Sequence, residues 1–562
     1  MEEKDFPWWK ETTVYQIYPR SFLDSDGDGV GNLEGVISKL DYIEDMGFET
    51  IWFSPFYPSP QRDFGYDITD FTDIHTEYGS LETFDTLVRE MHERGMKIVL
   101  DMVLNHTSDQ HPWFLESRAS RDNPKRDWYI WRDGRMPAGK KPPNNWRSKV
   151  TGSGWHYDPV TEQWYWAAFL PCQPDLNYRN PEVQKAIIDA VRFWLDRGAD
   201  GMRLDIIGSL FEDEEFRDNP FTLTFFPSAD DPDKLFRSTV MTEHHPDTFQ
   251  FIKRLRTVAD EYSSPQRFMV GEAFGDIQTL RKYCGGEKQD GLHTVFLFQT
   301  LGTKMRAGDF RGLLEEFEKG FPDPLIPTWV FSNHDRYRWI SVQGNVPGKA
   351  KLTAALLFTV RGIPYTYYGE EIGMLQYERD PDMALDGITR QFSRLPNFAV
   401  RMLQRISGGS VIRDGARTPM QWSAGANAGF CPGAVSPWLP IHPDFETVNV
   451  EYETNLPGSI LSCYRKFLNL RKKESALRRG TLELIDAAEL PKTVLGYRRV
   501  YPPATAGEHR SLTVYLNFSF KPAEIPLLPG ESPLTSTEPS PEAEGNTLGL
   551  RPWEGVVVGG SG

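Results

Sequence analysis

The chain has few of the sequence features that mark disulfide-rich secreted proteins, zinc-binding proteins or membrane-spanning proteins. It contains only four cysteines, and no two of them form a C-x-x-C pair: Cys172, Cys284, Cys431 and Cys463. This spacing argues against a disulfide framework or a zinc site, and it favours a reducing compartment. The acidic N-terminus, Met1 to Phe6, has no apolar h-region, so we expect no secretory signal and a cytoplasmic location. No run of about 18 apolar residues is present, so no membrane span is expected.

Positive charge is also in short supply. Lys and Arg number 62 against 79 Asp and Glu, which gives a formal net charge of −17. This balance disfavours nucleic acid and anionic membranes as partners, and it suits a small neutral substrate. The 562 residues, 39% of them hydrophobic, are enough for a barrel of about 250 residues with additional modules. Nothing in the sequence indicates an oligomeric state.

A regular alternation of strand-like and helix-like patterns opens the chain. Residues 13–17, 48–53 and 97–104 are apolar strand candidates, while residues 33–46 and 81–94 have helical spacing. Such alternation predicts a parallel sheet with crossover helices.

Three carboxylates lie within or directly after apolar runs typical of buried strands: Asp205, Glu272 and Asp335. The C-terminal ends of successive parallel strands meet on one face of a barrel. A pair of neighbouring carboxyl groups, one protonated and one ionised, is the minimum equipment for cleaving a glycosidic bond. A lone aspartate is more often a helix cap or a salt-bridge partner, but three in such motifs predict a glycosidase.

Several motifs resemble those of one known family. Four of them resemble, in the same order, the signature regions of the α-amylase superfamily (glycoside hydrolase family 13): DMVLNH at 101–106, GMRLD at 201–205, VGEAF at 270–274 and FSNHD at 331–335. Three others resemble the branch that contains oligo-1,6-glucosidases and α-glucosidases: WKETTVYQIYP at 9–19, QPDLN at 173–177 and ARTPMQW at 416–422.

The resemblance, together with the alternation, implies a fold class. It is α/β: a (β/α)8 TIM barrel with an inserted domain after the third strand and a C-terminal antiparallel β-sandwich. Residues 1–104 and 178–475 would form the barrel. Residues 105–177, where the alternation breaks, would form the inserted lid domain B. Residues 476–562, with short strands punctuated by Pro and Gly, would form the sandwich.

The resemblance also implies roles. Asp205 would be the nucleophile, and Glu272 the general acid that later acts as the base. Asp335 would grip sugar hydroxyls and favour a distorted ring. The remaining residues of these motifs would hold Asp205 ionised or bind hydroxyls of the same sugar: Arg203, His106 and His334.

A closed pocket is expected at the non-reducing end of the substrate. In the resembled enzymes the tyrosine matching Tyr66 stacks on the terminal sugar. Asp67 would pair with Arg417 in a bidentate clamp that closes the pocket and limits cleavage to the chain end. Phe169 and Gln173 match positions that line this sugar site.

An acidic loop after the first strand predicts a structural cation, since hard cations prefer several oxygens around a tight turn. The expected ligands of this Ca²⁺-type site are Asp24, Asp26, Asp28, Val30 and Asn32. Gly35 stands where an EF-hand has its twelfth-position glutamate, so the loop is not an EF-hand. No cofactor is expected for catalysis.

The residue after the nucleophile leaves the linkage open. In this branch valine there is associated with α-1,6 activity, and alanine, glycine or threonine with α-1,4 activity, whereas this chain has Ile206. The function expected from the resemblance is therefore a retaining exo-α-glucosidase acting on short α-glucosides. A transglycosylase or isomerase on the same scaffold, such as a sucrose isomerase or trehalose-forming enzyme, is the alternative. A non-catalytic amylase-like subunit is disfavoured, because this chain keeps the three carboxylates.

Overall fold

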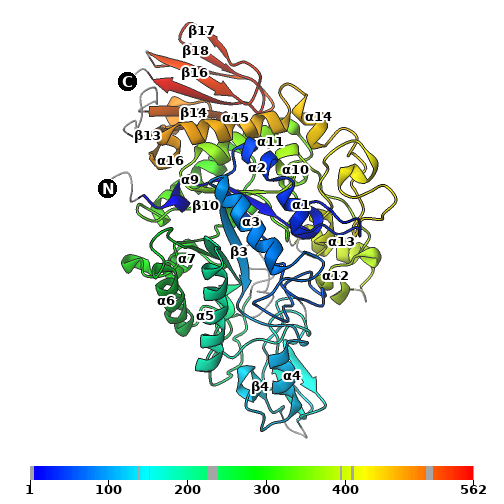
Figure 1. Cartoon of the computed structure of the whole chain (residues 1–562). Helices are drawn as coiled ribbons and strands as arrows, with labels where there is room; N and C mark the ends of the chain where they lie inside the picture. The colour runs from blue at the N-terminus through cyan, green and yellow to red at the C-terminus, as the bar shows by residue number, and fades with distance from the viewer. Residues whose placement is uncertain are drawn as a thin grey trace.

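The computed structural model describes residues 6–135, 139–150, 152–223, 238–392, 395–406, 411–501, 511–528 and 530–560. Residues 1–5, which entered the expectation about a signal sequence, lie outside these ranges. Figure 1 shows a central barrel, a small subdomain at one end and a β-rich domain at the other.

A parallel eight-stranded sheet forms the centre. Its order is β10-β11-β1-β2-β3-β7-β8-β9. In chain order the strands are β1 (Val14–Ile17), β2 (Thr50–Phe53), β3 (Lys97–Val103), β7 (Gly201–Asp205), β8 (Phe268–Gly271), β9 (Thr294–Val295), β10 (Thr328–Val330) and β11 (Ile363–Tyr367). These strands are buried along nearly their whole length, as expected for a sheet covered on both faces.

Threonine side chains join β9 and β10, the two ends of this strand order. Thr294 Oγ1 donates to the Ile326 carbonyl at 2.7 Å, and Thr328 Oγ1 donates to the Val295 carbonyl at 3.0 Å. Thr328 Oγ1 also accepts from the Leu297 amide at 2.9 Å. The sheet is thereby a nearly closed barrel, with the carboxyl ends of all strands on one face.

Helices cover the outside of the barrel. The principal ones are α1 (Leu33–Ile37), α2 (Leu40–Met46), α3 (Leu81–Glu93), α5 (Pro181–Asp196), α6 (Pro246–Asp260), α7 (Ile277–Tyr283), α9 (Ala307–Gly320), α11 (Pro347–Thr359) and α15 (Ile460–Lys473). Residues 33–46 were expected to form one helix and instead form two. Ser38 Oγ donates to the Gly35 carbonyl at 2.7 Å, a local bond that competes with the helical ladder at the break.

The segment after β3 forms the small subdomain. It holds α4 (Pro112–Ala119) and a sheet of order β4-β6-β5, made of β4 (Trp131–Arg132), β5 (Trp155–Asp158) and β6 (Gln163–Trp166). Trp146, Trp155 and Trp166 form its own buried core. Isolated bridges of His106 with Asp175 and of Tyr129 with Leu176 bring the end of this segment back to its beginning.

Two antiparallel sheets form the C-terminal domain. The five-stranded sheet contains β12 (Thr481–Leu484), β13 (Val494–Val500), β14 (Ser511–Asn517), β19 (Gly555–Gly560) and β16 (Glu531–Ser536). The three-stranded sheet contains β15 (Ala523–Pro526), β18 (Thr547–Leu550) and β17 (Glu542–Glu544). Apolar side chains of both sheets, among them Val494, Ile525 and Leu548, share one core, so the pair is a sandwich.

Two buried arginines, one from the sandwich and one from the barrel, meet at the C-terminal end of α11. Arg499, on β13, donates to the Thr359 carbonyl at 2.7 Å, and Arg471, on α15, donates to the Phe358 carbonyl at 3.2 Å. The last carbonyls of a helix have no intrahelical partner and carry partial negative charge. The two guanidinium groups therefore satisfy the end of α11 where the domains meet.

The expected fold class is confirmed by this barrel, its insertion after the third strand and the C-terminal sandwich. Among the residues that the structure describes, no helix combines the length and the apolarity needed to cross a bilayer.

Candidate active site

Arg203 lies at the centre of the candidate site and is 1% exposed. Its Nη1 is 2.7 Å from Oδ1 of Asp101 and 2.5 Å from Oδ1 of Asp205, while its Nη2 is 2.6 Å from Oε2 of Glu272. One planar cation thus holds three carboxyl groups, including the expected nucleophile and the expected acid.

The strand register explains this convergence. Asp101 of β3 pairs with Arg203 of β7, and Arg203 pairs with Val270 of β8, two residues before Glu272. Side chains two residues apart on a strand point to the same face, so Arg203 and Asp205 both project into the barrel. The amide of Glu272 donates to the Leu204 carbonyl at 2.8 Å, which places the acid next to the nucleophile strand.

The two candidate catalytic carboxyls, Glu272 and Asp205, have different pKa values. Burial raises the pKa of Glu272 to about 8 in spite of the charge of Arg203, with help from the charge of Asp205. Burial also raises the pKa of Asp205, but only to about 6, and Arg203 again opposes the rise. A side-chain hydrogen bond between the two carboxyls lowers the pKa of Asp205 and raises that of Glu272. Asp205 therefore ionises first while Glu272 keeps its proton.

His334 is fixed in a buried polar stack. The Tyr66 ring lies parallel to it at 5.3 Å between centroids, and the Tyr66 hydroxyl is 2.6 Å from His334 Nε2 and 3.0 Å from Oδ2 of Asp101. On the other side, Gln16 Nε2 is 2.8 Å from His334 Nδ1. Burial lowers the pKa of His334. The ring is therefore a neutral, oriented group beside Asp335, 3.0 Å from its Oδ2.

His106, Phe169 and Gln173 come together at the junction of the subdomain and the barrel. The His106 ring lies 5.4 Å from the Phe169 ring, and its Nε2 is 3.1 Å from Nε2 of Gln173. Gln173 Nε2 also donates to Oδ2 of Asp63 at 3.0 Å. Burial lowers the pKa of His106 to about 4, so the ring is neutral near pH 7.

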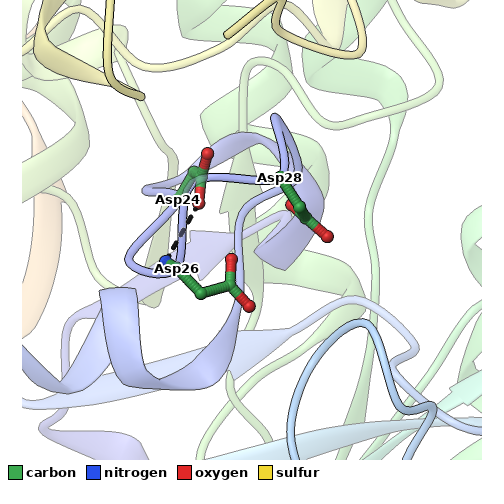
Figure 2. A group of neighbouring side chains, drawn as sticks. All are labelled: Asp24, Asp26 and Asp28. Carbon is green, nitrogen blue, oxygen red and sulfur yellow. Dashed lines mark hydrogen bonds between the residues drawn. The ribbon is translucent and has the colours of Figure 1, made fainter.

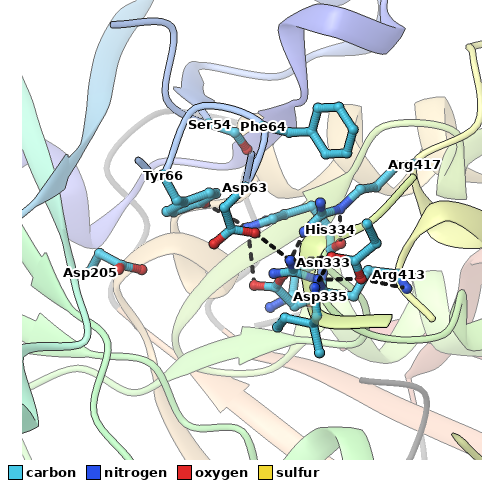
Figure 3. A network of polar contacts seen from close by, with 12 residues as sticks. Ser54, Asp63, Phe64, Tyr66, Asp205, Asn333, His334, Asp335, Arg413 and Arg417 are labelled. Carbon is cyan, nitrogen blue, oxygen red and sulfur yellow. Dashed lines mark hydrogen bonds and ion pairs between the residues drawn. The ribbon is translucent and has the colours of Figure 1, made fainter. Parts of the chain in front are cut away.

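The expected clamp between Asp67 and Arg417 is wrong, and the structure forms it from other residues of the same two segments. Arg413 Nη2 is 2.5 Å from Oδ1 of Asp63, and Arg413 Nη1 is 3.0 Å from Oδ1 of Asp335. Arg417 instead donates to Oδ1 of Asp335 and to the His334 carbonyl, both at 2.8 Å. Figure 3 shows Asp63 and both arginines around Asp335.

Local backbone geometry explains why Asp63, and not Asp67, pairs with Arg413. Phe64 and Gly65 both have positive φ, 46° and 104°, and they reverse the chain between the two aspartates. Asp63 then faces the arginines, while Asp67 turns back and accepts from Ser59 Oγ at 2.7 Å and from the Asp63 amide at 3.1 Å. Asp67 therefore stabilises the loop that carries Asp63.

Asp335 is the most exposed of the three candidate catalytic carboxylates, with 29% of its side chain accessible. Burial alone would raise its pKa, but His334 and the two arginines outweigh burial and hold the pKa well below its usual value. Asp335 is therefore an ionised group at the open side of the site, suited to accept hydrogen bonds from sugar hydroxyls.

Ile206 directly follows the nucleophile and adopts a left-handed conformation, with φ 43° and ψ 44°. A β-branched residue is rarely found there, because its side chain crowds the backbone. The amide of the next residue, Ile207, donates to the Glu272 carbonyl at 3.0 Å. The strained turn thus ties the end of the nucleophile strand to the acid.

Three of the five expected metal ligands gather in one turn. One carboxylate oxygen from each of Asp24, Asp26 and Asp28 lies within 4.8 Å of the other two. Figure 2 shows the three side chains on this turn. Asn32 is instead the N-cap of α1, since its Oδ1 accepts from the Gly35 amide at 2.8 Å. Val30 donates its amide to Asp28 Oδ1 at 2.7 Å, which tightens the turn. A set of carboxylate oxygens on a glycine-rich turn fits a hard cation such as Ca²⁺.

Four residues that make contacts in the site were not expected from the sequence: Asp101, Asp63, Arg413 and Gln16. Asp101 carried one usable signal, because it is a carboxylate inside an otherwise apolar strand and lies on the same face as Val103 and Asn105. The other three are polar residues in or near motifs, and only the folded chain distinguishes them from their neighbours.

This barrel places two carboxyl groups with different pKa values next to each other at its strand ends. These are the catalytic groups that a glycoside hydrolase needs. The model of the family described as "Alpha amylase, catalytic domain" matches residues 16–480. The chain therefore belongs to the α-amylase family of glycoside hydrolases.

Named relatives agree with this assignment. The chain is 39% identical over 511 residues to a probable α-glucosidase of Rhizobium meliloti, with 88% of each chain covered. It is 35% identical over 580 residues to an oligo-1,6-glucosidase of Parageobacillus thermoglucosidasius, with 98% of each covered. Among solved structures, an α-glucosyl transfer enzyme superposes with a TM-score of 0.86 at 37% identity, covering 99% of this chain and 100% of the other. The trehalulose synthase of Pseudomonas mesoacidophila MX-45 has a TM-score of 0.85 at 31% identity, with 99% of each chain covered.

Proposed function

We propose that the protein is a retaining, exo-acting α-glucosidase that releases terminal non-reducing glucose from short α-glucosides. The observation that carries this proposal is the placement of Asp205 and Glu272 on the two Nη atoms of one arginine. Retaining glycosidases have their carboxyls about 5–5.5 Å apart, whereas inverting enzymes leave room for a water at about 6.5–9.5 Å. The mutual effect of Asp205 and Glu272 on each other's pKa is consistent with the shorter, retaining spacing.

The first step would form a covalent glucosyl-enzyme. An oxygen of ionised Asp205 bonds to the anomeric carbon as the glycosidic C–O bond breaks, and Glu272 gives its proton to the departing oxygen. The leaving group departs as an alcohol, and Glu272 is left ionised. Its raised pKa makes it a donor near neutral pH, while Arg203 keeps Asp205 ionised.

The second step would reverse these roles. Glu272 takes a proton from a water molecule whose oxygen bonds to the anomeric carbon, and the bond to Asp205 breaks. Glucose leaves with the configuration it had in the substrate, and both carboxyls return to their starting states. The ionised Asp335 and the neutral His334 and His106 are placed to bind hydroxyls of the sugar, contacts that can strengthen as the ring distorts.

Exo action is supported by the ion pair of Asp63 with Arg413, because it joins the loop after β2 to the long segment after β11. A bidentate or networked Asp–Arg pair between two such loops closes a pocket rather than leaving a through-cleft. The α-glucosidase and oligo-1,6-glucosidase names of the relatives support a glucose-terminated substrate.

A substrate panel tests the proposal. We expect glucose as the first product from maltose, isomaltose, sucrose, trehalose and kojibiose in some order of preference, and little action on long starch. Asp205→Asn should abolish turnover. Rapid cleavage of starch to large fragments, or near-normal activity of Asp205→Asn, would contradict the proposed function.

Glucosyl transfer or sucrose isomerisation is the second candidate. It is favoured by structural neighbours described as an α-glucosyl transfer enzyme and a trehalulose synthase. The first half-reaction would be the same, and an acceptor hydroxyl would replace water in the second. Product analysis with sucrose as substrate separates the two, since hydrolysis yields free glucose and fructose in equal amounts.

We also propose that Asp24, Asp26 and Asp28 hold a structural Ca²⁺ or a similar cation, with no metal taking part in catalysis. The supporting observation is the closeness of their three carboxylates in a turn outside the arginine-centred site. We further propose a cytoplasmic location, supported by four buried cysteines that are all unpaired.

A further inference from the structure

A buried ion pair joins the subdomain to the segment between β7 and α6. Lys149 Nζ contacts Oε1 of Glu243, and the two side chains are only 13% and 10% exposed. Thr239 Oγ1 donates to the other carboxylate oxygen, Oε2, at 2.6 Å. Burial alone would raise the pKa of Glu243, but Lys149 outweighs it and lowers the pKa to about 2, so the pair is ionic.

On the subdomain side, Lys149 lies against the wall of the sugar site. Its amide donates to the Ala168 carbonyl at 2.6 Å, and Ser148 Oγ donates to the Phe169 carbonyl at 2.6 Å. The Lys149 ammonium is 5.9 Å from the centre of the Phe169 ring, which in turn lies 5.4 Å from His106. A change in the position of Lys149 would therefore alter the packing around Phe169.

On the barrel side, Glu243 is followed by a residue that touches both catalytic loops. The His244 amide donates to the Gly208 carbonyl at 2.8 Å, and a Cβ on Gly208 or on Gly275 would lie 3.6 and 3.9 Å from the His244 ring. Gly208 lies three residues after Asp205, and Gly275 three residues after Glu272. His244 has a φ of 56°, a conformation that its contacts must maintain.

The ion pair lies on the side of the barrel where the leaving group departs. The clamp of Asp63 and Arg413 follows strands β2 and β11, which flank β1 in the sheet order. Strands β7 and β8 lie across the barrel from β1. A substrate whose terminal glucose fills the clamp must therefore extend over the loops after β7 and β8.

A small cleft lies beside the ion pair. It is lined by residues of the subdomain and of the segment between β7 and α6, among them Ser148, Lys149, Trp166, Asn219, Thr239 and Thr242. The cleft thus marks where the two sides joined by the ion pair meet.

We propose that Lys149 and Glu243 form a latch that sets leaving-group specificity, by fixing the distance between the Phe169 wall and the loops that carry Asp205 and Glu272. The proposal rests on the proposed glucosidase function. Neither side chain is placed in the glucose clamp, so both are positioning residues. Opening the latch widens the space for the leaving group and leaves the grip on the terminal glucose unchanged.

The test uses Lys149→Met, Glu243→Gln and the double variant in the full-length protein. Glu243→Gln keeps the shape and the acceptor for Thr239, so it reports on the charge pair even if Lys149→Met folds poorly. The matched control is Arg118→Met, which breaks the 2.7 Å ion pair of Arg118 with buried Asp158 inside the same subdomain.

We expect kcat/KM for a trisaccharide relative to that for the matching disaccharide to rise about tenfold in each latch variant. The double variant should show the shift of a single variant, because paired groups act as one unit. Competitive inhibition by glucose should stay unchanged, and Arg118→Met should leave the ratio at its wild-type value. An unchanged ratio in Glu243→Gln, or an equal shift in Arg118→Met, would overturn the latch.

A second measurement does not need activity. Backbone amide hydrogen exchange over residues 238–245 should accelerate in both latch variants, because the His244–Gly208 bond loses its tether, and it should not change in Arg118→Met. Unchanged exchange in this segment would overturn the latch by itself. If the wild type cleaves no α-glucoside while exchange responds as expected, the proposed function fails and the latch stands as a structural tether.

Discussion

Asp101 and Arg203 face each other from neighbouring strands, with Oδ1 of Asp101 2.7 Å from Nη1 of Arg203. The same nitrogen holds Asp205, so Asp101 competes with the candidate nucleophile for one cation. The charge of Asp101 also contributes to the raised pKa of Asp205.

Asp101→Asn should therefore act in two ways. We expect kcat to fall by about 10²-fold, because Arg203 loses the group that orients it. We expect the acid limb of the pH–rate profile to move to lower pH, since one negative charge near Asp205 is gone. Tyr57→Phe is the control, because the Tyr57 hydroxyl donates only to the backbone carbonyl of Asp101, at 2.8 Å. An acid limb that stays in place would contradict the role given to Asp101.

The wild-type profile should be bell-shaped. Activity requires Asp205 ionised, which is lost as pH falls through about 6, and Glu272 protonated, which is lost as pH rises through about 8. The optimum should therefore lie near pH 7, and both limbs belong to the coupled pair rather than to single groups. Measurement of kcat/KM from about pH 4 to about pH 10 checks this. A profile that keeps rising below about pH 5 would contradict the division of roles.

The pairing of Arg413 with Asp63 rather than with Asp67 can be tested by replacing each of the two aspartates in turn. Asp63→Asn should raise KM by about tenfold or more through loss of the ion pair to Arg413, and the loss of stability should be limited because Arg413 keeps its ion pairs with Asp386 and Asp335. Asp67→Asn should instead cost about 1–3 kcal/mol of stability, because the buried carboxylate accepts from Ser59 and two backbone amides. Steady-state kinetics and thermal unfolding of both variants decide between them. The opposite pattern would restore Asp67 as the sugar ligand.

Stability should depend on pH through two buried carboxyls between the subdomain and the barrel. Burial raises the pKa of Asp175 to about 7 and that of Glu212 well above its ordinary value, and the charge of Asp175 adds to the rise at Glu212. Carboxyls whose folded pKa is raised stabilise the fold below their unfolded pKa near 4, and this contribution is lost as pH rises through the folded pKa.

Glu212→Gln removes one of these titrations and keeps an oxygen to accept from Trp166 Nε1, now at 3.1 Å. The variant should match the wild type near pH 4, and its advantage in stability should then grow by up to about 1.4 kcal/mol per pH unit until the folded pKa is passed. Thermal unfolding across this range gives the difference. Glu214→Gln, at a side chain 72% exposed, is the control and should show no such trend. A gap that shrinks as pH rises would contradict the assignment.

Cation binding to the Asp24 turn should appear in thermal unfolding. A ligand at about 100 times its Kd stabilises the folded state by about 2.7 kcal/mol, so a chelator should lower Tm and added Ca²⁺ should restore it. Asp26→Asn should abolish the response, because its exposed carboxylate belongs to the cluster. Asp70→Asn, in a turn where Asp70 caps Thr72, should leave the response intact. An identical response in wild type and Asp26→Asn would place the cation elsewhere.

The sequence by itself determined the elements and the chemistry that lies within single motifs. Alternating patterns predicted the first barrel strands and the helix α3, because hydrophobic period is a local property. Arg203 and Asp205 share one face because they are two residues apart on a strand, which is also a local property. The helix expected over residues 33–46 was less accurate, since it divides into α1 and α2.

Only the tertiary structure decided which polar residue of each loop faces the sugar site. Asp63 and Asp67 are the same residue type in one loop, and so are Arg413 and Arg417 in another. Positive φ angles at Phe64 and Gly65 reverse the chain and send one aspartate to the arginines and the other to its own turn. The contact of Lys149 with Glu243 likewise joins residues 94 positions apart. One lies in the insertion after β3 and the other in the segment between β7 and α6. Such pairings depend on how separate loops pack against each other, which no local pattern in the chain encodes.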